Sequence, residues 1–152
     1  MDNREVINDV LVNLFNEILR LEEEAIITDK YKDISNNDMH IIEAVGLGGG
    51  NMSSIAAKLK ITVGSLTTSM NSLVKKGYVK RERGEEDRRV VYISLSDKGK
   101  KAFVHHARFH KEMITSIMDE FDDDEKKILI RGLTTLDNWF KNKEEENKKN
   151  RE

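Results

Sequence analysis

The sequence contains no cysteine and no proline, and aromatic residues make up only 6% of it. The absence of cysteine excludes disulfides and thiolate metal ligands, so any metal would have to be bound by the four histidines and by carboxylates. Because the sequence contains no proline, no long helix is interrupted by a proline residue. No apolar run approaches the roughly 20 residues that span a bilayer, and the start, residues 1–5, does not resemble a signal peptide. We therefore expect a soluble, cytoplasmic protein.

The length and composition indicate one globular domain with a strongly charged surface. The chain has 152 residues, of which 38% are apolar and 36% are charged. Residues 141–152 contain no apolar side chain. We therefore expect a single domain over 1–140, followed by a charged, disordered tail over 141–152.

Charge is distributed unevenly along the chain. Between Lys58 and Lys101, twelve Lys and Arg stand against five Asp and Glu, a net charge of +7, so the total of −2 leaves −9 for the two flanks. One basic segment in an acidic chain is typical of a protein that meets DNA through a single face. A solvated charged surface is the plainer alternative.

Apolar residues at helical spacing predict three long helices, at about 4–24, 97–120 and 123–140. Ser96 is a suitable N-cap for the second of these helices. For the third, Asp122 is the candidate N-cap, and Glu125, three residues later, can complete a capping box. The apolar stripe of segment 4–24 is wider than packing against a single neighbouring element requires. We expect this helix to pack on two surfaces.

The middle of the chain predicts three short helices. Ser35, Ser53 and Thr62 are their candidate N-caps, and Gly77 ends the last of them. The link between the second and the third is only a few residues long, which is typical of a helix-turn-helix.

The helix over 62–76 is expected to have one apolar and one polar face. Leu66, Met70 and Leu73 share the apolar face. The opposite face carries short hydrogen-bonding side chains and one lysine, namely Ser65, Thr68, Asn71, Ser72 and Lys75. Short side chains permit a close approach to base edges and phosphates, and no acidic residue lies between positions 58 and 81. This pattern favours a helix that reads DNA over an ordinary solvated helix.

Strand-forming residues at 78–79 and 90–95 flank a polar stretch and predict a hairpin with a charged tip. Asp87 is placed to hold one guanidinium at this tip, which leaves Arg88 or Arg89 to enter a narrow, electronegative minor groove. A surface hairpin with local ion pairs is the alternative interpretation.

These elements occur in a recognisable combination: 55–59, 62–77, Arg81, the Asp87-Arg88-Arg89 run, and the stretch from Tyr92 to Gly99. In this combination the chain resembles the MarR family of winged helix-turn-helix transcriptional regulators. The resemblance implies a mainly α fold in which residues of about 36–96 form the winged helix-turn-helix, with a small β-hairpin as its wing.

The resemblance also implies an intertwined homodimer. The three long helices at about 4–24, 97–120 and 123–140 would form its interface, including the Trp139-Phe140 end. A two-fold dimer implies double-stranded DNA with a palindromic operator as the partner. The DNA-binding residues implied are Thr62, Ser65, Thr67, Thr68, Asn71, Ser72, Lys75, Arg81, Asp87, Arg88 and Arg89.

Within this family the chain is most similar to repressors of fatty-acid biosynthesis genes in Gram-positive bacteria, in residues 32–35 with 39–40, 62–69 and 108–111. Residues 48–50, three glycines, depart from that group. The similarity implies a long-chain acyl group on acyl carrier protein as co-repressor, held in an apolar pocket. The candidate lining is His40, Phe103, His106, Phe109, His110 and Met113.

The histidines also suit a metal. His106 and His110 are four residues apart on one helix face, and His40 with Glu22 could complete a zinc site that resembles that of the zinc-sensing branch of the family. That branch uses a cysteine, which this chain lacks. We prefer the interpretation that no metal is required and that these histidines line a polar part of the pocket.

Two other classes of protein remain to be weighed. An enzyme is disfavoured because the sequence has no cysteine nucleophile, no GxSxG motif and no Gly-rich phosphate loop. A winged helix used only for protein contacts is the stronger rival, and strong, salt-dependent affinity for DNA would exclude it.

Overall fold

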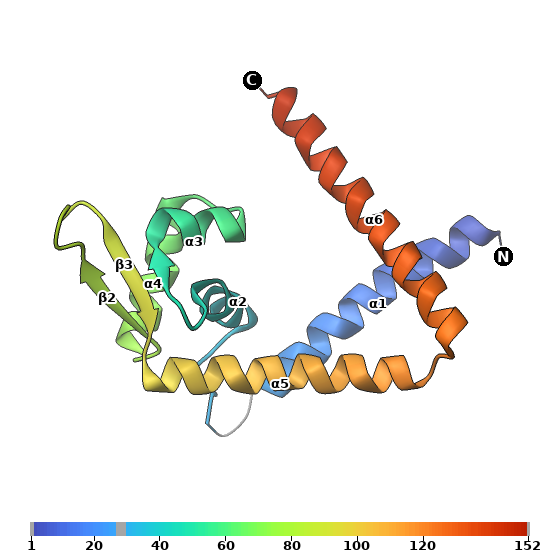
Figure 1. The fold of residues 1–152 in the computed structure, drawn as a ribbon, viewed down its shortest axis with the longest axis horizontal. Coiled ribbons are helices and arrows are strands. Elements are labelled where there is room, and N and C mark those ends of the chain that lie inside the picture. Colours follow the sequence, from blue (N-terminus) through green and yellow to red (C-terminus); the bar gives the residue numbers. More distant parts are fainter. Residues whose placement is uncertain (1, 27–29, 152) are drawn as a thin grey trace. The chain divides into compact units, whose positions relative to one another are not determined.

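The computed structural model describes residues 2–26 and 30–151 and consists of helices with one small sheet (Figure 1). None of the described helices is both long enough and apolar enough to cross a bilayer. In chain order the elements are α1 (Asn3–Ile26), α2 (Asn36–Val45), β1 (Gly50–Asn51), α3 (Met52–Leu59), α4 (Val63–Lys75), β2 (Val79–Arg83), β3 (Val91–Leu95), α5 (Asp97–Asp119) and α6 (Asp123–Lys149).

The chain divides into two compact units, with the boundary between His110 and Lys111. The first holds the elements from α1 to β3 and the first fourteen residues of α5, and the second holds the end of α5 and α6. All of the buried hydrophobic core described here belongs to the first unit.

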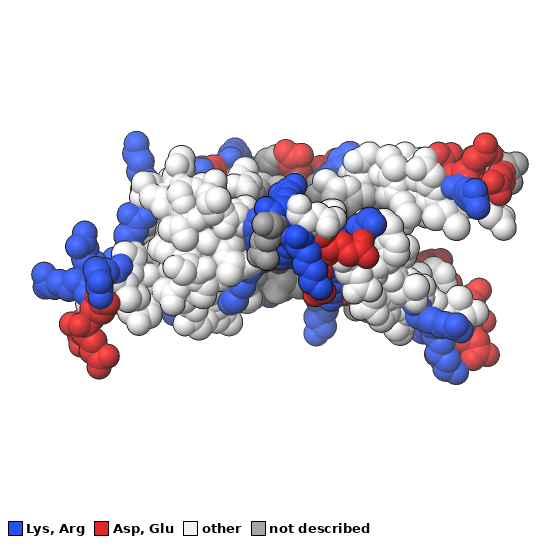
Figure 2. Space-filling view, turned by 90° about the horizontal axis from the view of Figure 1, so that it is seen from above, with Lys and Arg blue, Asp and Glu red and all other residues white. Residues whose placement is uncertain are grey.

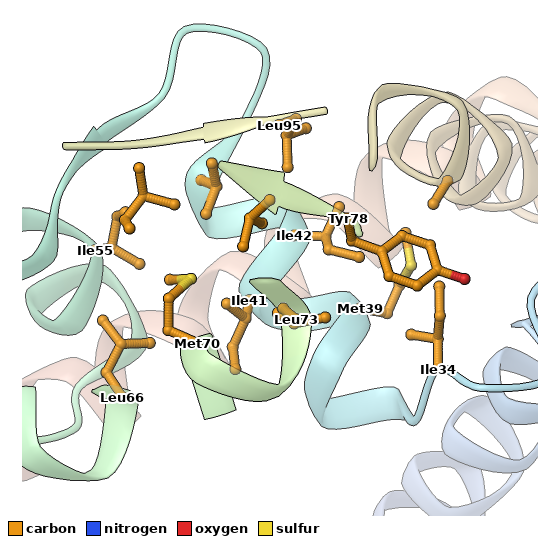
Figure 3. Close-up of a cluster of buried hydrophobic side chains, with 14 of the residues drawn as sticks. Ile34, Met39, Ile41, Ile42, Ile55, Leu66, Met70, Leu73, Tyr78 and Leu95 are labelled. Carbon is orange, nitrogen blue, oxygen red and sulfur yellow. The ribbon is translucent and has the colours of Figure 1, made fainter. Parts of the chain in front are cut away.

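The core of the first unit is built under α4. Leu66, Met70 and Leu73 are fully buried, as the apolar face of this helix predicts, and they pack against Ile41 and Ile55 (Figure 3). The polar face of the same helix is thereby turned outward. The buried face of α4 therefore determines which side chains a partner can meet.

Most predicted helix starts are confirmed. The Ser35 and Thr62 side chains accept hydrogen bonds from backbone N–H groups at the starts of α2 and α4, and Asp122 forms a capping box at the start of α6. The Ser53 cap was wrong, because α3 begins two residues earlier: the Asn51 side chain accepts from the backbone N–H of Ser54. Asparagine is at least as good an N-cap as serine, and the sequence offers both.

The sheet has one strand more than the predicted hairpin. β2 and β3 pair antiparallel, with Val79 opposite Leu95 and Arg83 opposite Val91. The two-residue β1 pairs with the other edge of β3, which gives the order β1-β3-β2. A strand of two residues has no periodicity that sequence analysis can detect.

The segment expected to be a disordered tail, 141–152, is mostly helical. α6 continues to Lys149, and ion pairs three or four residues apart follow its exposed face, such as Lys141 with Asp137 at 2.6 Å and Lys148 with Glu144 at 3.3 Å. Lys and Glu are good helix formers, and nothing between 141 and 149 interrupts the helix. The absence of apolar residues was therefore a poor indicator of disorder here.

Tyr78 joins four parts of the first unit. Its buried ring lies against Ile34 and Met39, and its hydroxyl donates a 2.6 Å hydrogen bond to Asp33 Oδ1 (Figure 3). The hydrogen bond from Tyr78 holds the pKa of Asp33 below its ordinary value, while burial and then that same hydrogen bond raise the pKa of Tyr78. Lys98 Nζ of α5 lies 4.3 Å from the ring centroid.

The start of α5 lies close to the Tyr78 backbone. The Tyr78 carbonyl accepts a 3.0 Å hydrogen bond from the Ser96 backbone N–H, and Ser96 caps α5 by accepting from the Gly99 backbone N–H. A Cβ added at Gly99 would overlap the Tyr78 carbonyl oxygen. Gly99 is therefore required by a close approach between two backbones.

We expect Gly99→Ala to destabilise the fold by about 1–3 kcal/mol, because the methyl group must displace backbone atoms. Gly64→Ala in the same unit is the control, since its Cβ would meet only Thr62 Oγ1, at 3.9 Å. Urea unfolding followed by circular dichroism measures both. Equal midpoints for the two variants would contradict this close approach.

We expect Tyr78→Phe to lower the free energy of unfolding by about 1 kcal/mol at pH 7, because the hydrogen bond to ionised Asp33 is lost. The pKa of Asp33 is lowered in the folded protein, so this stabilisation is complete above the carboxyl group's ordinary pKa near 3.9 and is lost as the pH falls below it. Urea unfolding of both proteins between pH 7 and pH 3 tests this. A difference that does not change with pH would show that Asp33 is not the partner.

Candidate nucleic-acid interface and histidine cluster

The outward face of α4 is polar and accessible. Ser65, Thr68, Asn71 and Lys75 are exposed, and Thr67 and Ser72 are half-buried. Thr62 fixes the first turn: its hydroxyl accepts from the Ser65 backbone N–H and donates to Ser65 Oγ at 2.9 Å. The structure thus brings these sequence-predicted residues together on one face of one helix. Such a face fits the major groove of B-form DNA.

A contact between α4 and β2 was not foreseen. An Arg81 guanidinium nitrogen donates a 2.6 Å hydrogen bond to Asn71 Oδ1. The contact occupies the amide oxygen and leaves the amide NH₂ as a donor for a base or phosphate acceptor. Both residues belong to the predicted set, but their contact depends on how β2 packs beside α4.

The turn between β2 and β3 presents two arginines. Asp87 accepts hydrogen bonds from the backbone N–H and the guanidinium of Arg89, at 3.0–3.1 Å, which lowers the pKa of Asp87. The prediction that Asp87 holds one guanidinium is confirmed. The Arg89 side chain is still 92% exposed, and Arg88 is exposed as well. Figure 2 shows Lys and Arg gathered at the end of the molecule that carries this hairpin.

A basic cavity of about 480 Å³ lies between the hairpin and the starts of α3 and α4. It is lined by Asn51, Met52, Ser53, Val63, Thr67, Arg81, Arg83, Arg89, Val90 and Val91. Three arginines and no carboxylate line it, which suits a phosphate group. Asn51, Ser53 and Arg83 were missed by the sequence analysis. Arg83 carried a signal, since it follows Arg81 by two residues and therefore shares its face of β2.

A second polar cluster joins α1, α2 and α5. His110 Nε2 lies 2.8 Å from Glu22 Oε1 and 3.0 Å from His106 Nε2, and His106 Nε2 lies 3.0 Å from Glu43 Oε1. Glu22 is 6% exposed and His106 only 1%. The hydrogen bond with His106 holds the pKa of Glu43 below its ordinary value. Glu43 was also missed, although it follows His40 by three residues on α2.

The donor set of this cluster fits a metal ion in part. One ligand atom from each of Glu22, His106 and His110 lies within 4.8 Å of the others. His40, also in the predicted set, is more distant, with Nε2 3.8 Å from Glu22 Oε2. Nitrogen and carboxylate ligands of this kind bind zinc in tetrahedral sites. The His106 Nδ1 atom is buried without a hydrogen-bond partner in the described structure.

The predicted pocket residues are only partly brought together. The Phe109 ring lies beside those of His106 and His110, with centroids 6.4 and 5.6 Å away. Phe103 packs against the hydrophobic core instead. Met113 belongs to the second unit. The role of this set as a ligand pocket stays a prediction.

Comparison with known proteins gives consistent results. Residues 24–105, more than half of the chain, match the family of transcriptional regulators SarA/Rot. The crystal structure of Streptococcus pneumoniae FabT in complex with DNA is 37% identical, covers 92% of this chain and 99% of its own, and has a TM-score of 0.88.

A regulator from Lactococcus lactis subsp. cremoris, ZitR, is 26% identical over 71% of this chain and 77% of its own. The structure of Lactococcus lactis ZitR, a zinc-responsive MarR family member, is 23% identical, covers 90% of this chain and 98% of its own, and has a TM-score of 0.68. These relatives are transcriptional regulators and not enzymes. The chain therefore belongs to the SarA/Rot and MarR-type family of winged-helix transcriptional regulators, which bind DNA.

Proposed function

We propose that this regulator is a repressor that binds a palindromic operator as a homodimer and controls genes of fatty-acid biosynthesis. The observation that carries the proposal is the similarity to FabT, which extends over nearly the whole of both chains. The residues that face outward from α4 and the hairpin support it, since their polarity and charge suit contact with DNA.

In this proposal, α4 lies in the major groove and the hairpin tip enters the adjacent minor groove. The basic cavity lies between these two elements, where the strand backbone that separates the grooves would pass. Arg83 and Ser53 then contact phosphates and set the position of the protein on the duplex. Thr68 and Asn71 read base edges.

The exposed apolar side chains of α1 and α6 support the homodimer. On α1 they include Ile7, Leu14 and Phe15, and on α6 they include Trp139 and Phe140, all at least half exposed. Burying a side chain of this size stabilises a complex by about 1.5–3 kcal/mol. Two helices with such faces are typical of a subunit interface.

The proposed effector is a long-chain acyl group delivered by acyl carrier protein. Its binding region is the junction of α1, α2 and α5, where Phe109 lies beside the histidine cluster. A ligand that favours the DNA-binding arrangement by about 1–3 kcal/mol would raise DNA affinity roughly 5- to 150-fold.

Zinc is a second candidate effector, favoured by one observation. Glu22, His106 and His110 place three suitable ligand atoms close together, and His40 lies beside Glu22. Zinc bound there would link α1, α2 and α5, since these helices supply the ligands.

We expect Thr68→Ala and Arg89→Ala each to weaken DNA binding about tenfold while leaving the protein folded. Arg89→Ala should also lower the dependence of log K on log salt by about 1, because one cation that displaces counterions from the minor groove is lost. Gel-shift titration against duplexes selected from a random library by the wild-type protein measures both. Lys149→Ala, on the exposed end of α6, is the control. If both variants bind DNA with wild-type affinity, the proposed DNA-binding mode is contradicted.

We expect palmitoyl-acyl carrier protein to raise the affinity for the same duplexes at least fivefold, whereas palmitate-free carrier protein has a smaller effect. Zinc is titrated in parallel, with His106→Ala as its control, because the variant removes one proposed ligand. A response to zinc that His106→Ala abolishes, with none to the acyl protein, would replace the acyl effector with the metal.

A further inference from the structure

The contact between Arg81 and Asn71 fixes which atom of the Asn71 amide remains for a partner. The guanidinium nitrogen of Arg81 lies 2.6 Å from Oδ1 of Asn71. A guanidinium carries only hydrogen-bond donors, so the atom that faces it must be the amide oxygen, because the opposite orientation would place two donors against each other. The NH₂ group of Asn71 is therefore the part of the amide that a base can meet.

The short connection between α4 and β2 sets the position of Arg81. Gly77 has a positive φ of 83° in this turn, and the Tyr78 backbone N–H donates a 3.0 Å hydrogen bond to the Leu73 carbonyl of α4. Arg81 follows in β2, which pairs antiparallel with β3. The backbone of Arg81 is thus held by the turn and by the sheet, and its contact with Asn71 is part of the fold.

The surroundings of the contact disfavour a second donor at the amide oxygen. Both Arg81 and Asn71 are exposed, and over residues 2–26 and 30–151 no carboxylate forms an ion pair with Arg81. The guanidinium therefore keeps its full positive charge. A carbonyl oxygen has a second lone pair, but a donor brought to it would lie beside this charge and be repelled. Asn71 consequently acts as a donor and not as an acceptor.

The bases differ in what they offer to such a donor in the major groove. Guanine presents two acceptors, O6 and N7, whereas adenine presents the acceptor N7 beside the N6 amino donor. An unconstrained asparagine pairs with adenine by using its oxygen and its nitrogen together. With the Asn71 oxygen occupied, the adenine amino group has no acceptor, whereas both guanine acceptors face an NH₂ group. An unpaired donor in a contact surface is costly.

We propose that Arg81 sets the base preference of Asn71, so that Asn71 selects guanine over adenine at the position it reads. The inference rests on the proposed function, in which α4 lies in the major groove and Asn71 contacts a base edge. Arg81 is a positioning residue, because it acts on the base through Asn71. Arg83 differs from it: both line the basic cavity, but within the described residues no hydrogen bond joins Arg83 to Asn71. Arg83 contributes charge without specifying a base.

The test measures base preference, which a loss of charge alone does not change. Random duplex libraries are bound by the full-length wild-type protein and by each variant, and the bound duplexes are sequenced. Asn71→Ala identifies the position that Asn71 reads, because the preference is lost there and kept elsewhere. We expect the wild type to favour guanine over adenine at this position about tenfold. Titrations of two duplexes that differ only in this base pair measure the ratio directly.

Arg81→Met frees the amide oxygen, so the ratio should shift at least tenfold toward adenine. Arg83→Met is the matched control, since it removes a guanidinium from the same strand and the same cavity. We expect both variants to bind DNA more weakly and with a smaller salt slope, but only Arg81→Met to change the preferred base. Circular dichroism melts establish that the variants are folded.

If the wild type does not favour guanine over adenine at the position that Asn71 reads, or if Arg81→Met leaves the ratio unchanged, the inference is wrong and the proposed function stands. If Asn71→Ala changes no base preference although the wild type selects a sequence, other residues read the operator and the inference is again wrong. If the wild type selects no sequence at all, the proposed function fails and the inference fails with it.

Discussion

The arrangement of the first unit depends on Tyr78. Its backbone N–H donates to the Leu73 carbonyl at the end of α4, and its carbonyl receives the chain that starts α5. Its hydroxyl reaches Asp33, in the segment before α2. The backbone and the buried side chain of this one residue therefore connect α4, the hairpin, α5 and the segment that precedes α2. A shift in any of these elements must be accommodated at this residue, because packed cores do not deform continuously.

Much of the fold could be predicted from the sequence because its signals are local. Side-chain caps such as Ser35 and Asp122, and the buried stripe of α4, depend on residues within one or two turns. The two-residue β1 could not be predicted, since it exists only where β3 offers an edge. The helical end of α6 was missed for a different reason. Composition alone does not separate a disordered charged segment from a solvated helix stabilised by ion pairs.

In the candidate site, too, some features follow from a local sequence pattern and others depend on how the elements pack. The outward residues of α4 follow from the helical period, and the Asp87–Arg89 pair from a spacing of two residues. The contact of Arg81 with Asn71 and the contact of Glu43 with His106 join segments distant in sequence. Only the packing of β2 on α4 and of α2 on α5 brings these groups within reach. Sequence patterns on one element carry no information about them.

α5 connects the residues of one basic cavity, lined by Lys100, Lys101 and Arg108 among others, with the packing around Tyr78. The chain has a net charge of −2, yet two cavities that share no lining residue are each lined by cations and by no carboxylate. α5 starts against Tyr78, beside the hairpin, and carries His105, His106 and Arg108 farther along. These residues therefore belong to the same helix whose first turn packs against Tyr78. A ligand at those residues can change the affinity for DNA only if the ligand and DNA favour the same position of this helix.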